Sequence, residues 1–461
     1  MNPIGAAIAA NRFGLGARPG ELQRITHPDK WLLGQLAGPP AHPAELRGLP
    51  DSASVLAATG ELRRRQRAAR RAGEDTANEY GRTVRQHYVD QAAARYRHAA
   101  LTEHPFHERL VHFFTNHFAV SADKQPLPAI AGLFENEAIR PHVNGTFFDL
   151  LLAVEKHPAM LLYLDNQRSI GPNSPLGRRA RRRRSNQAVG LNENLAREIL
   201  ELHTLGVDGG YTQEDVTSFA SVLTGWSIGG AGENGRFADG VPGRFEFRET
   251  IHEPGTQRVL GRRYTQPGVA QGEAVLRDLA THPATARFVS TKLVRHFVAD
   301  EAPGPIVDRL VRAWLGSNGD LPTVLEALVL APGSWGGSHQ KYKSPHDFVV
   351  STLRAFEYVP DRPQFIVGAL DLLGQAPYRP GSPEGWPDTA AQWGGADALY
   401  QRIEWSNTVA RVVGARVDPA ALGDAVLGAR FAAETRKAVS RAESRVQGTT
   451  LLLASPDFQR R

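Results

Sequence analysis

The residues best suited to acid/base chemistry lie in the segment 192–206, NENLAREILELHTLG. It holds the carboxylates of Glu193, Glu198 and Glu201 and the guanidinium of Arg197, and its apolar residues recur at helical spacing. At about 100° per residue, these charged side chains share one face of a helix, and His203 points away from it. Carboxylates held close together acquire separated pKa values, which general acid and base catalysis requires.

A structural interpretation accounts for the same segment. Glu193 and Arg197 form an i,i+4 pair in the favourable order, Arg197 and Glu201 continue it, and Gly206 supplies a helix stop. Each such pair stabilises an exposed helix by only about 0.2–0.5 kcal/mol. The segment alone therefore leaves two alternatives open, a reaction site and a solvated helix face.

Polar residues in other apolar segments favour the reaction site. Asp165 and Asn166 end the stretch LYLDN, and Asn116 and His117 interrupt an aromatic run, where each needs a buried partner. If the helices at 104–120, 147–166 and 192–206 pack together, their polar groups meet in a cleft with little water. The candidates for ligand binding in that cleft are Asn194, Asn116, His117 and Asn166.

A divalent metal is one alternative for this cleft, although no specific motif marks it. Glu108 and His112 are four residues apart and could share an ion along one helix, whereas His117 would need Glu198 or Asp165 as further ligands. A mixed set of imidazole and carboxylate ligands suits a first-row divalent ion. Each His taken singly is more commonly a hydrogen-bonded core or surface residue.

Two catalytic motifs are not supported by their surroundings. GWSIG at 225–229 matches the G-x-S-x-G pattern, but a nucleophile at Ser227 would need a strand before it and a helix after it. The spacing instead predicts a turn that ends a helix, with Trp226 tucked inward. Cys is absent from all 461 residues, which excludes disulfides and thiol catalysis.

Hydrophobic periodicity predicts a mainly α, multi-helical protein with a small β-hairpin region near 240–264, where RFEFRE alternates. We expect three packed regions: an N-terminal helical region at 1–100, a helical core at 101–360, and a C-terminal helical region at 361–461 that packs with the core as one unit. Helices are expected near 28–36, within 50–100, at 104–120, after a cap at Thr212 with Asp215 three residues on, and at 269–300, 305–316 and 320–331.

No run approaches the roughly 18 apolar residues of a membrane span. The apolar stretch from Ile4 to Ala10 has no basic residue before it, so it does not have the pattern of a signal peptide. We predict a soluble protein, cytoplasmic as the sequence stands.

Two surface features have both a structural and a functional interpretation. Most of the formal charge of +6 comes from Arg, which clusters at 61–74 and 178–184. We interpret both clusters as solvated surfaces, and nucleic acid is not favoured as a partner because no aromatic residues lie between the Arg residues for base stacking. Aromatic residues gather at 385–405, where they either cap helices or stack on a sugar: Trp386, Trp393, Tyr400 and Trp405.

A series of segments along the chain resembles a bacterial family of unknown function, DUF1800. The resemblance extends nearly end to end, through FFTNHFAVS, HPAMLLYLDN, HPATARFVSTKLVRHFV and KYKSPHDFVVSTLRAF, and its most specific part is 192–226. The resemblance implies an extracytoplasmic location as the alternative to a cytoplasmic one, and a sulfatase-like protein of a neighbouring family as a partner. It implies no reaction. The positions that the family pattern marks are Asn116, His117, Asp165, Asn166, Asn192, Glu193, Asn194, Arg197, Glu198, Glu201, Leu202, Gly206, Tyr211, Thr212, Asp215, Thr224, Gly225, Trp226 and His252.

These observations together predict a hydrolase-type enzyme acting on a glycan or another cell-envelope polymer. Glu198 and Glu201 are the candidates for acid and base, and Arg197 would anchor an anionic or hydroxyl-rich group. Because two carboxylates three residues apart on one helix are closer than glycosidase pairs usually are, Glu193 or Asp165 is the alternative partner. The resemblance adds Trp226 and His252 to the candidate ligand-binding residues. The competing hypothesis is a non-enzymatic binding or assembly protein whose polar cluster is structural.

Overall fold

The computed structural model describes residues 3–37, 42–74, 77–182, 190–230, 239–336, 341–414 and 417–461. Within these ranges the chain is mainly helical, and its strands form two antiparallel two-stranded sheets. The predicted fold class is therefore confirmed. The end of the Arg run, residues 183–184, lies outside the described residues.

The helices follow one another from the first described residues to the last. The first twelve are α1 (Pro3–Ile8), α2 (Glu21–Arg24), α3 (Pro28–Leu33), α4 (Ser52–Arg71), α5 (Glu79–Leu101), α6 (Pro105–His117), α7 (Ala131–Phe134), α8 (Phe147–Lys156), α9 (Pro158–Tyr163), α10 (Pro175–Arg182), α11 (Asn194–Glu198) and α12 (Gln213–Leu223). The others are α13 (Val269–Ala280), α14 (Pro283–Phe297), α15 (Gly304–Ser317), α16 (Leu321–Val329), α17 (Pro345–Ala355), α18 (Pro363–Leu372), α19 (Ala390–Trp393), α20 (Ala396–Val413), α21 (Pro419–Leu427), α22 (Ala433–Ser440), α23 (Arg445–Ala454) and α24 (Pro456–Gln459). Within the described ranges, three segments are π-helical: η1 (Ala9–Phe13), η4 (Glu135–Ile139) and η6 (Ile199–Thr204).

Local sequence signals account for several helix ends. The Thr212 hydroxyl accepts from the Asp215 backbone while the Asp215 carboxylate accepts from the Thr212 backbone, so the predicted capping box begins α12. The helix expected at 269–300 is instead two helices. Pro283 is the first residue of α14 and lacks the N–H that a continuous helix would need there, so α13 ends at Ala280.

The β structure differs in detail from the hairpin expected near 240–264. Strand β2 (Phe245–Phe247) carries the alternating sequence but pairs with β1 (Trp226–Ile228), whereas the tight hairpin is formed by β3 (Gln257–Val259) and β4 (Arg262–Tyr264). The predicted turn is present at Thr224 and Gly225, where it ends α12, and Trp226 is fully buried as expected but also begins a strand. The reason is long-range, because β1 finds its partner about twenty residues further on.

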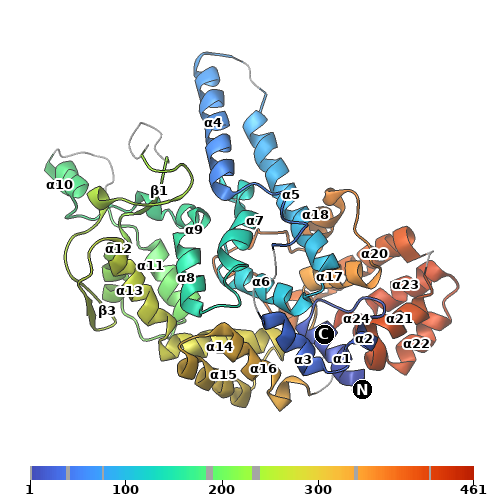
Figure 1. Cartoon of the computed structure of the whole chain (residues 1–461). Helices are drawn as coiled ribbons and strands as arrows, with labels where there is room; N and C mark the ends of the chain where they lie inside the picture. The colour runs from blue at the N-terminus through green and yellow to red at the C-terminus, as the bar shows by residue number, and fades with distance from the viewer. Residues whose placement is uncertain are drawn as a thin grey trace.

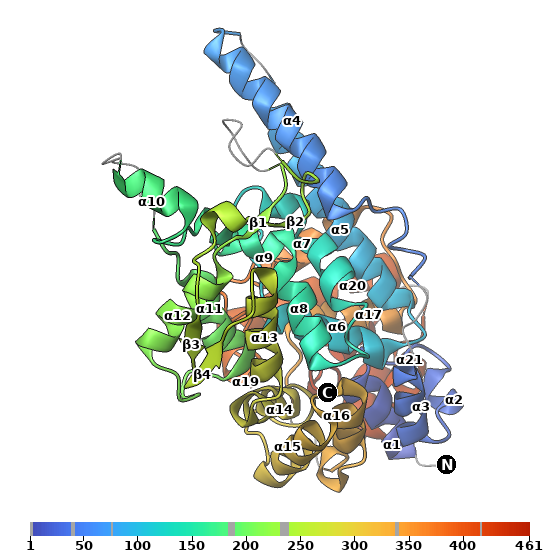
Figure 2. The ribbon, with the colours of Figure 1, turned by 60° about the vertical axis from the view of Figure 1, so that its left-hand side comes forward.

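The body surrounds α6, which lies between α8 and α17 in both ribbon views (Figures 1 and 2). From this body α4 and α5 project as an antiparallel arm, on which Arg64 and Arg65 pair with Glu61 in solvent. One continuous hydrophobic cluster extends from Ala6 to Phe458. No helix of the described residues has both the length and the apolar character needed to cross a bilayer.

Candidate active-site cavity

A cavity of about 620 Å³ opens beside the carboxyl-terminal half of α6. Its walls come from α5, α6, α14, the start of α17 and the segment 375–392, which are far apart in the sequence. Aromatic rings such as Phe113 and Trp386 share the lining with Lys, His, Arg and Asp side chains. A concave site with convergent polar groups on an apolar wall is the usual form of a small-molecule site.

The segment 384–389 is fixed to the end of α6 by Asn116. The Asn116 Nδ2 donates to the Trp386 carbonyl at 2.9 Å, and the Trp386 backbone N–H donates to the Asn116 Oδ1 at 2.7 Å. Gly385 has a φ of +88°, and a Cβ there would lie 2.3 Å from the Asn116 carbonyl oxygen, so only glycine allows this approach. Asn116 therefore positions a cavity wall.

This wall brings Asp388 against His296, the penultimate residue of α14. The His296 Nδ1 lies 2.7 Å from the Asp388 Oδ2, and because a carboxylate only accepts, Nδ1 carries the proton. Burial alone would raise the pKa of Asp388, but His296, Lys341 and Arg461 hold that pKa below its ordinary value. Burial lowers the pKa of His296 to about 4 despite the nearby carboxylate, so the imidazole is neutral at pH 7.

Lys292 lies one helical turn before His296 and also lines the cavity. Within the ranges that the structure describes, no carboxylate lies within ion-pair distance of its amine, which instead sits 5.4 Å from the centre of the Phe288 ring. Burial lowers the pKa of Lys292 to about 8, against the opposing pull of Glu384 and Asp388. The amine is therefore a cation that an incoming anion or developing negative charge could neutralise.

Behind the cavity, buried charges pair with one another. Asp347 lies 3.1 Å from Arg109 and 2.9 Å from Arg461. Burial would raise the pKa of Asp347, but these two guanidinium groups hold it well below its ordinary value. The carboxylate is thus a fixed anion that orients Arg109 toward the cavity wall.

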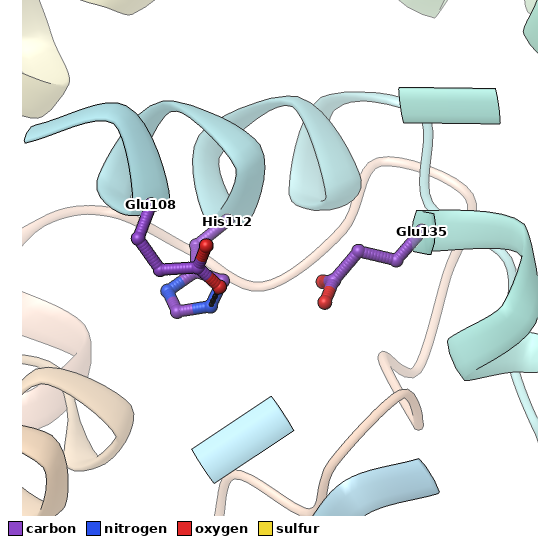
Figure 3. Close-up of side chains that lie close together, drawn as sticks. All are labelled: Glu108, His112 and Glu135. Atoms are coloured by element: carbon purple, nitrogen blue, oxygen red, sulfur yellow. Dashed lines mark ion pairs between the residues drawn. The ribbon is translucent and has the colours of Figure 1, made fainter. Parts of the chain in front are cut away.

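Glu108, His112 and Glu135 offer ligand atoms within 4.8 Å of one another, and Figure 3 shows Glu135 facing the other two from η4. Glu108 and His112 do meet, with 3.0 Å between Oε1 and Nε2. However, Arg140 forms a bidentate pair with Glu108, and Arg95 lies 2.9 Å from Glu135. Two guanidinium groups already neutralise both carboxylates, so a divalent ion would add two unbalanced positive charges to a buried site. The cluster fits an ion-pair network better than a metal site.

The sequence model of the family described as Protein of unknown function (DUF1800) matches residues 8–460. The chain belongs to the DUF1800 family. No curated protein and no solved structure matches it. The family resemblance predicted from the sequence is therefore confirmed. The family description states no reaction for this DUF1800 protein.

The segment 192–206 of the DUF1800 protein, called the signature segment below, begins as α11 and continues as the π-helical turn η6. A π-helix has more residues per turn than an α-helix, so the angles expected at 100° per residue do not hold beyond Ile199. His203 points away from the charged face, as expected, is 1% exposed, and lies 2.8 Å from Glu155, whereas the apolar Leu202 is only half-buried.

The predicted acid/base residues of this segment lie outside the cavity lining. Glu193 pairs with Arg197 at 3.1 Å and accepts hydrogen bonds from Gln213 and Thr217 on α12. Glu198 and Glu201 are half-buried, and the Tyr211 hydroxyl donates to Glu201 at 3.2 Å. Burial raises the pKa of Glu198, and Glu201 raises it further.

The other predicted residues make mostly structural contacts. Asp165 pairs with Lys124, and Asn166 donates to the carbonyls of Leu223 and Trp226. The His252 Nδ1 lies 2.8 Å from the Thr224 carbonyl oxygen, and Asn194 is exposed. His117 does line the cavity, where its Nε2 lies 3.1 Å from the carbonyl oxygen of His203. Among the residues predicted for the polar cleft, Asn116 and His117 line the cavity of this DUF1800 protein, as do His112, the possible metal ligand, and Trp386 from the aromatic group.

Sequence reasoning did not propose the pair of His296 and Asp388, nor Lys292. Each lies in a segment that was noted for another reason: KLVRHF for its family resemblance and GWPDTAAQW for its aromatic residues. An available signal was the single Asp after Trp-Pro in a loop rich in Gly, because loops held by a rigid scaffold commonly carry functional residues.

Proposed function

We propose that this protein is an enzyme of the hydrolase type and that its reaction takes place in the cavity between α6, α14 and the segment 375–392. The observation that carries this proposal is the short contact between the His296 Nδ1 and the Asp388 Oδ2 in the cavity wall. A neutral imidazole oriented by a carboxylate is a recurrent general base, because the carboxylate fixes the tautomer and stabilises the imidazolium that forms.

In this proposal His296 removes a proton from a water molecule or a substrate hydroxyl through its Nε2. The new N–H forms there, and the positive charge is balanced by Asp388. Arg109, whose Nη1 lies 3.4 Å from that Nε2, would have to turn toward the substrate as the proton arrives. Lys292 then neutralises negative charge on the substrate or the transition state.

The substrate class that we propose is a sugar or the end of a glycan chain. Trp386 lines the cavity and is half-buried, so part of its ring is accessible to a sugar, whereas Trp393 and Trp405 are buried. An amphipathic aromatic ring beside hydrogen-bonding groups suits a hydroxyl-rich ligand. The volume of about 620 Å³ lies within the usual range for small-molecule sites.

The test compares chromogenic glycosides, esters and phosphate esters as substrates of the wild type and of His296→Asn and Asp388→Asn. We expect one leaving-group class to be hydrolysed and the rate to fall about 100-fold or more in His296→Asn, which is typical of a lost general base. The matched control is His142→Asn, which alters a half-buried imidazole outside the cavity lining. Unchanged turnover in both cavity variants would refute the proposed site.

The acid/base pair proposed from the sequence is tested alongside. Glu198→Gln and Glu201→Gln should leave turnover within about twofold if the cavity is the reaction site. If they abolish turnover while His296→Asn does not, the reaction instead uses the half-buried carboxylates of α11 and η6.

A second candidate function is a non-enzymatic binding or assembly protein. It is favoured by the hydrogen bonds that Gln213 and Thr217 of α12 donate to Glu193, because these bonds hold the start of α11 against α12. In this alternative, a sulfatase-like neighbour, implied by the family resemblance, is the partner to test by co-purification. Loss of that complex in Glu193→Ala, with no hydrolysis of any chromogenic substrate by the wild type, would favour assembly over catalysis.

A further inference from the structure

Three buried rings and one carboxylate form a continuous chain that ends at the cavity. The Tyr96 hydroxyl lies 2.9 Å from the His346 Nδ1, and the His346 Nε2 lies 2.9 Å from the His112 Nδ1. The His112 Nε2 lies 3.0 Å from the Glu108 Oε1. Tyr96, His112 and His346 all line the cavity, and they come from α5, α6 and α17.

The direction of every proton in this chain follows from Glu108. Burial would raise the pKa of Glu108, but Arg140 and His98 hold it well below its ordinary value, so the carboxylate is ionised and only accepts. The His112 Nε2 contacts this anion at 3.0 Å as a charge contact rather than an aligned hydrogen bond, and this contact favours the proton on Nε2, so that Nδ1 accepts.

The same reasoning extends along the chain to the cavity. Burial lowers the pKa of both His112 and His346, so both imidazoles are neutral at pH 7. Because His112 accepts at Nδ1, His346 donates from Nε2 and accepts at its own Nδ1. The remaining donor is the hydroxyl of Tyr96. Each donor is therefore directed along the chain toward one fixed anion.

We propose that Tyr96 is a second proton-transfer or nucleophilic group of the cavity, activated through His346 and His112 by Glu108. The Tyr96 O–H bond breaks as an N–H bond forms at the His346 Nδ1, and the proton on the His346 Nε2 passes to the His112 Nδ1. The products are a phenolate facing the cavity and an imidazolium at His112 beside Glu108. This inference rests on the proposed function, because it takes the same cavity as the reaction site.

Burial raises the pKa of Tyr96 to about 12, and the charged groups around its hydroxyl act in both directions. The Arg95 guanidinium lies 5.7 Å from the centre of the Tyr96 ring and would stabilise a phenolate. Glu135 from η4 and Asp347 from α17 oppose it. Each of these two carboxylates is paired with an Arg, so its field at the phenolate is partly cancelled.

Tyr378 provides a matched control in the same cavity wall. It is 7% exposed and its ring centre lies 4.9 Å from the Arg95 guanidinium, so its burial and its cationic neighbour resemble those of Tyr96. Among the described residues, however, no imidazole lies within hydrogen-bond distance of its hydroxyl. A difference in reactivity between these two tyrosines therefore reports the His346 contact.

The experiment treats the full chain with benzenesulfonyl fluoride, whose sulfur bonds to a phenolate oxygen as fluoride leaves, and maps modified tyrosines by mass spectrometry. We expect Tyr96 to react at least about 10-fold faster than Tyr378, which corresponds to about 1.4 kcal/mol in the barrier. In His346→Gln, which accepts a hydrogen bond but takes no proton, the Tyr96 rate should fall to that of Tyr378, and its pH profile should move to higher pH. Equal rates in the wild type, no reaction at Tyr96, or an unchanged rate in His346→Gln would each overturn the proposal.

A second measurement needs no variant and no turnover. In protein labelled with ¹⁵N at histidine, His112 and His346 should both appear at pH 7.5 as neutral rings protonated on Nε2. A protonated ring, or a proton on Nδ1 of either residue, would break the chain and overturn the assignment. Because neither readout uses catalysis, failure here leaves the His296 proposal standing, and failure of the hydrolysis assay leaves these results interpretable.

Discussion

Replacement of Glu108 by Gln should reveal how much of the stability of this protein depends on paired buried charges. Glu108 is fully buried, forms a bidentate pair with Arg140 and lies 3.2 Å from His98. The Gln amide would keep one acceptor but turn an N–H group toward a guanidinium that still needs an anion. Breaking a buried pair from one side costs about 3–5 kcal/mol, so we expect the free energy of unfolding to fall by that amount.

The assay is chemical denaturation at pH 7.5, with Glu193→Gln as the control. Glu193 forms a partly exposed pair, and its loss should cost less than about 1 kcal/mol. Adding Arg140→Gln to Glu108→Gln should restore part of the loss, because the buried cation then disappears with its partner. A cost below about 1 kcal/mol for Glu108→Gln alone would refute the reasoning.

The stability difference between the wild type and Glu108→Gln should also depend on pH in a defined direction. A carboxylate whose pKa is lower in the folded state stabilises the fold above its unfolded pKa, and this contribution is lost as pH falls through the folded pKa. The pKa of Glu108 is well below its ordinary value of 4.5. The difference between the wild type and Glu108→Gln should therefore be largest above about pH 5 and shrink in acid. A difference that grows toward low pH would contradict the assignment.

Further predictions concern the cavity and its surroundings. Trinitrobenzenesulfonate should modify Lys292 with a midpoint near pH 8; a midpoint near the ordinary lysine value of 10.5 would contradict a desolvated amine. Asn116→Ala should cost about 1–3 kcal/mol in unfolding free energy and change the fluorescence of Trp386, because two partly buried hydrogen bonds are lost. Glu198→Gln should cause no loss of stability at pH 7.5, because burial raises the pKa of this carboxyl and disfavours its charged form; marked destabilisation would show an unrecognised partner. Treatment with EDTA should leave the melting temperature unchanged, and a stoichiometric divalent ion lost on treatment would contradict the ion-pair interpretation of Glu108 and Glu135.

The features that the sequence predicted correctly are those that depend on residues close together in the chain. The capping box at Thr212, the helical stop at Gly206 and the apolar periodicity of 104–120 each depend on residues close together in the chain, and the structure confirms all three. The partial exposure of Leu202 was not predictable in the same way, because the π-helical turn η6 depends on tertiary packing.

The cavity itself was the hardest feature to predict. His296 and Asp388 are separated by 92 residues in the sequence. No local pattern predicts that the segment 384–389, which Asn116 holds in place, brings them together. The sequence identified Asn116 as a polar residue in need of a buried partner, which was correct, but it could not show that the partner is a backbone segment 270 residues away. Long-range pairing of this kind requires either a structure or a set of covarying homologues.

The joining of distant segments around α6 also constrains the order in which this protein can fold. Asn11 donates to the carbonyl of Val426, 415 residues later, and Arg461 donates to the carbonyl of His296 beside the cavity. Contacts of such high sequence separation form slowly, because the chain loses the entropy of closing long loops before these contacts can stabilise it. On the ribosome, the wall that orients Asp388 would be completed only after the helices α20 to α24 emerge. A nascent chain that has already formed the arm of α4 and α5 would thus still expose the lining of its future cavity, and exposed apolar surface of this kind favours aggregation.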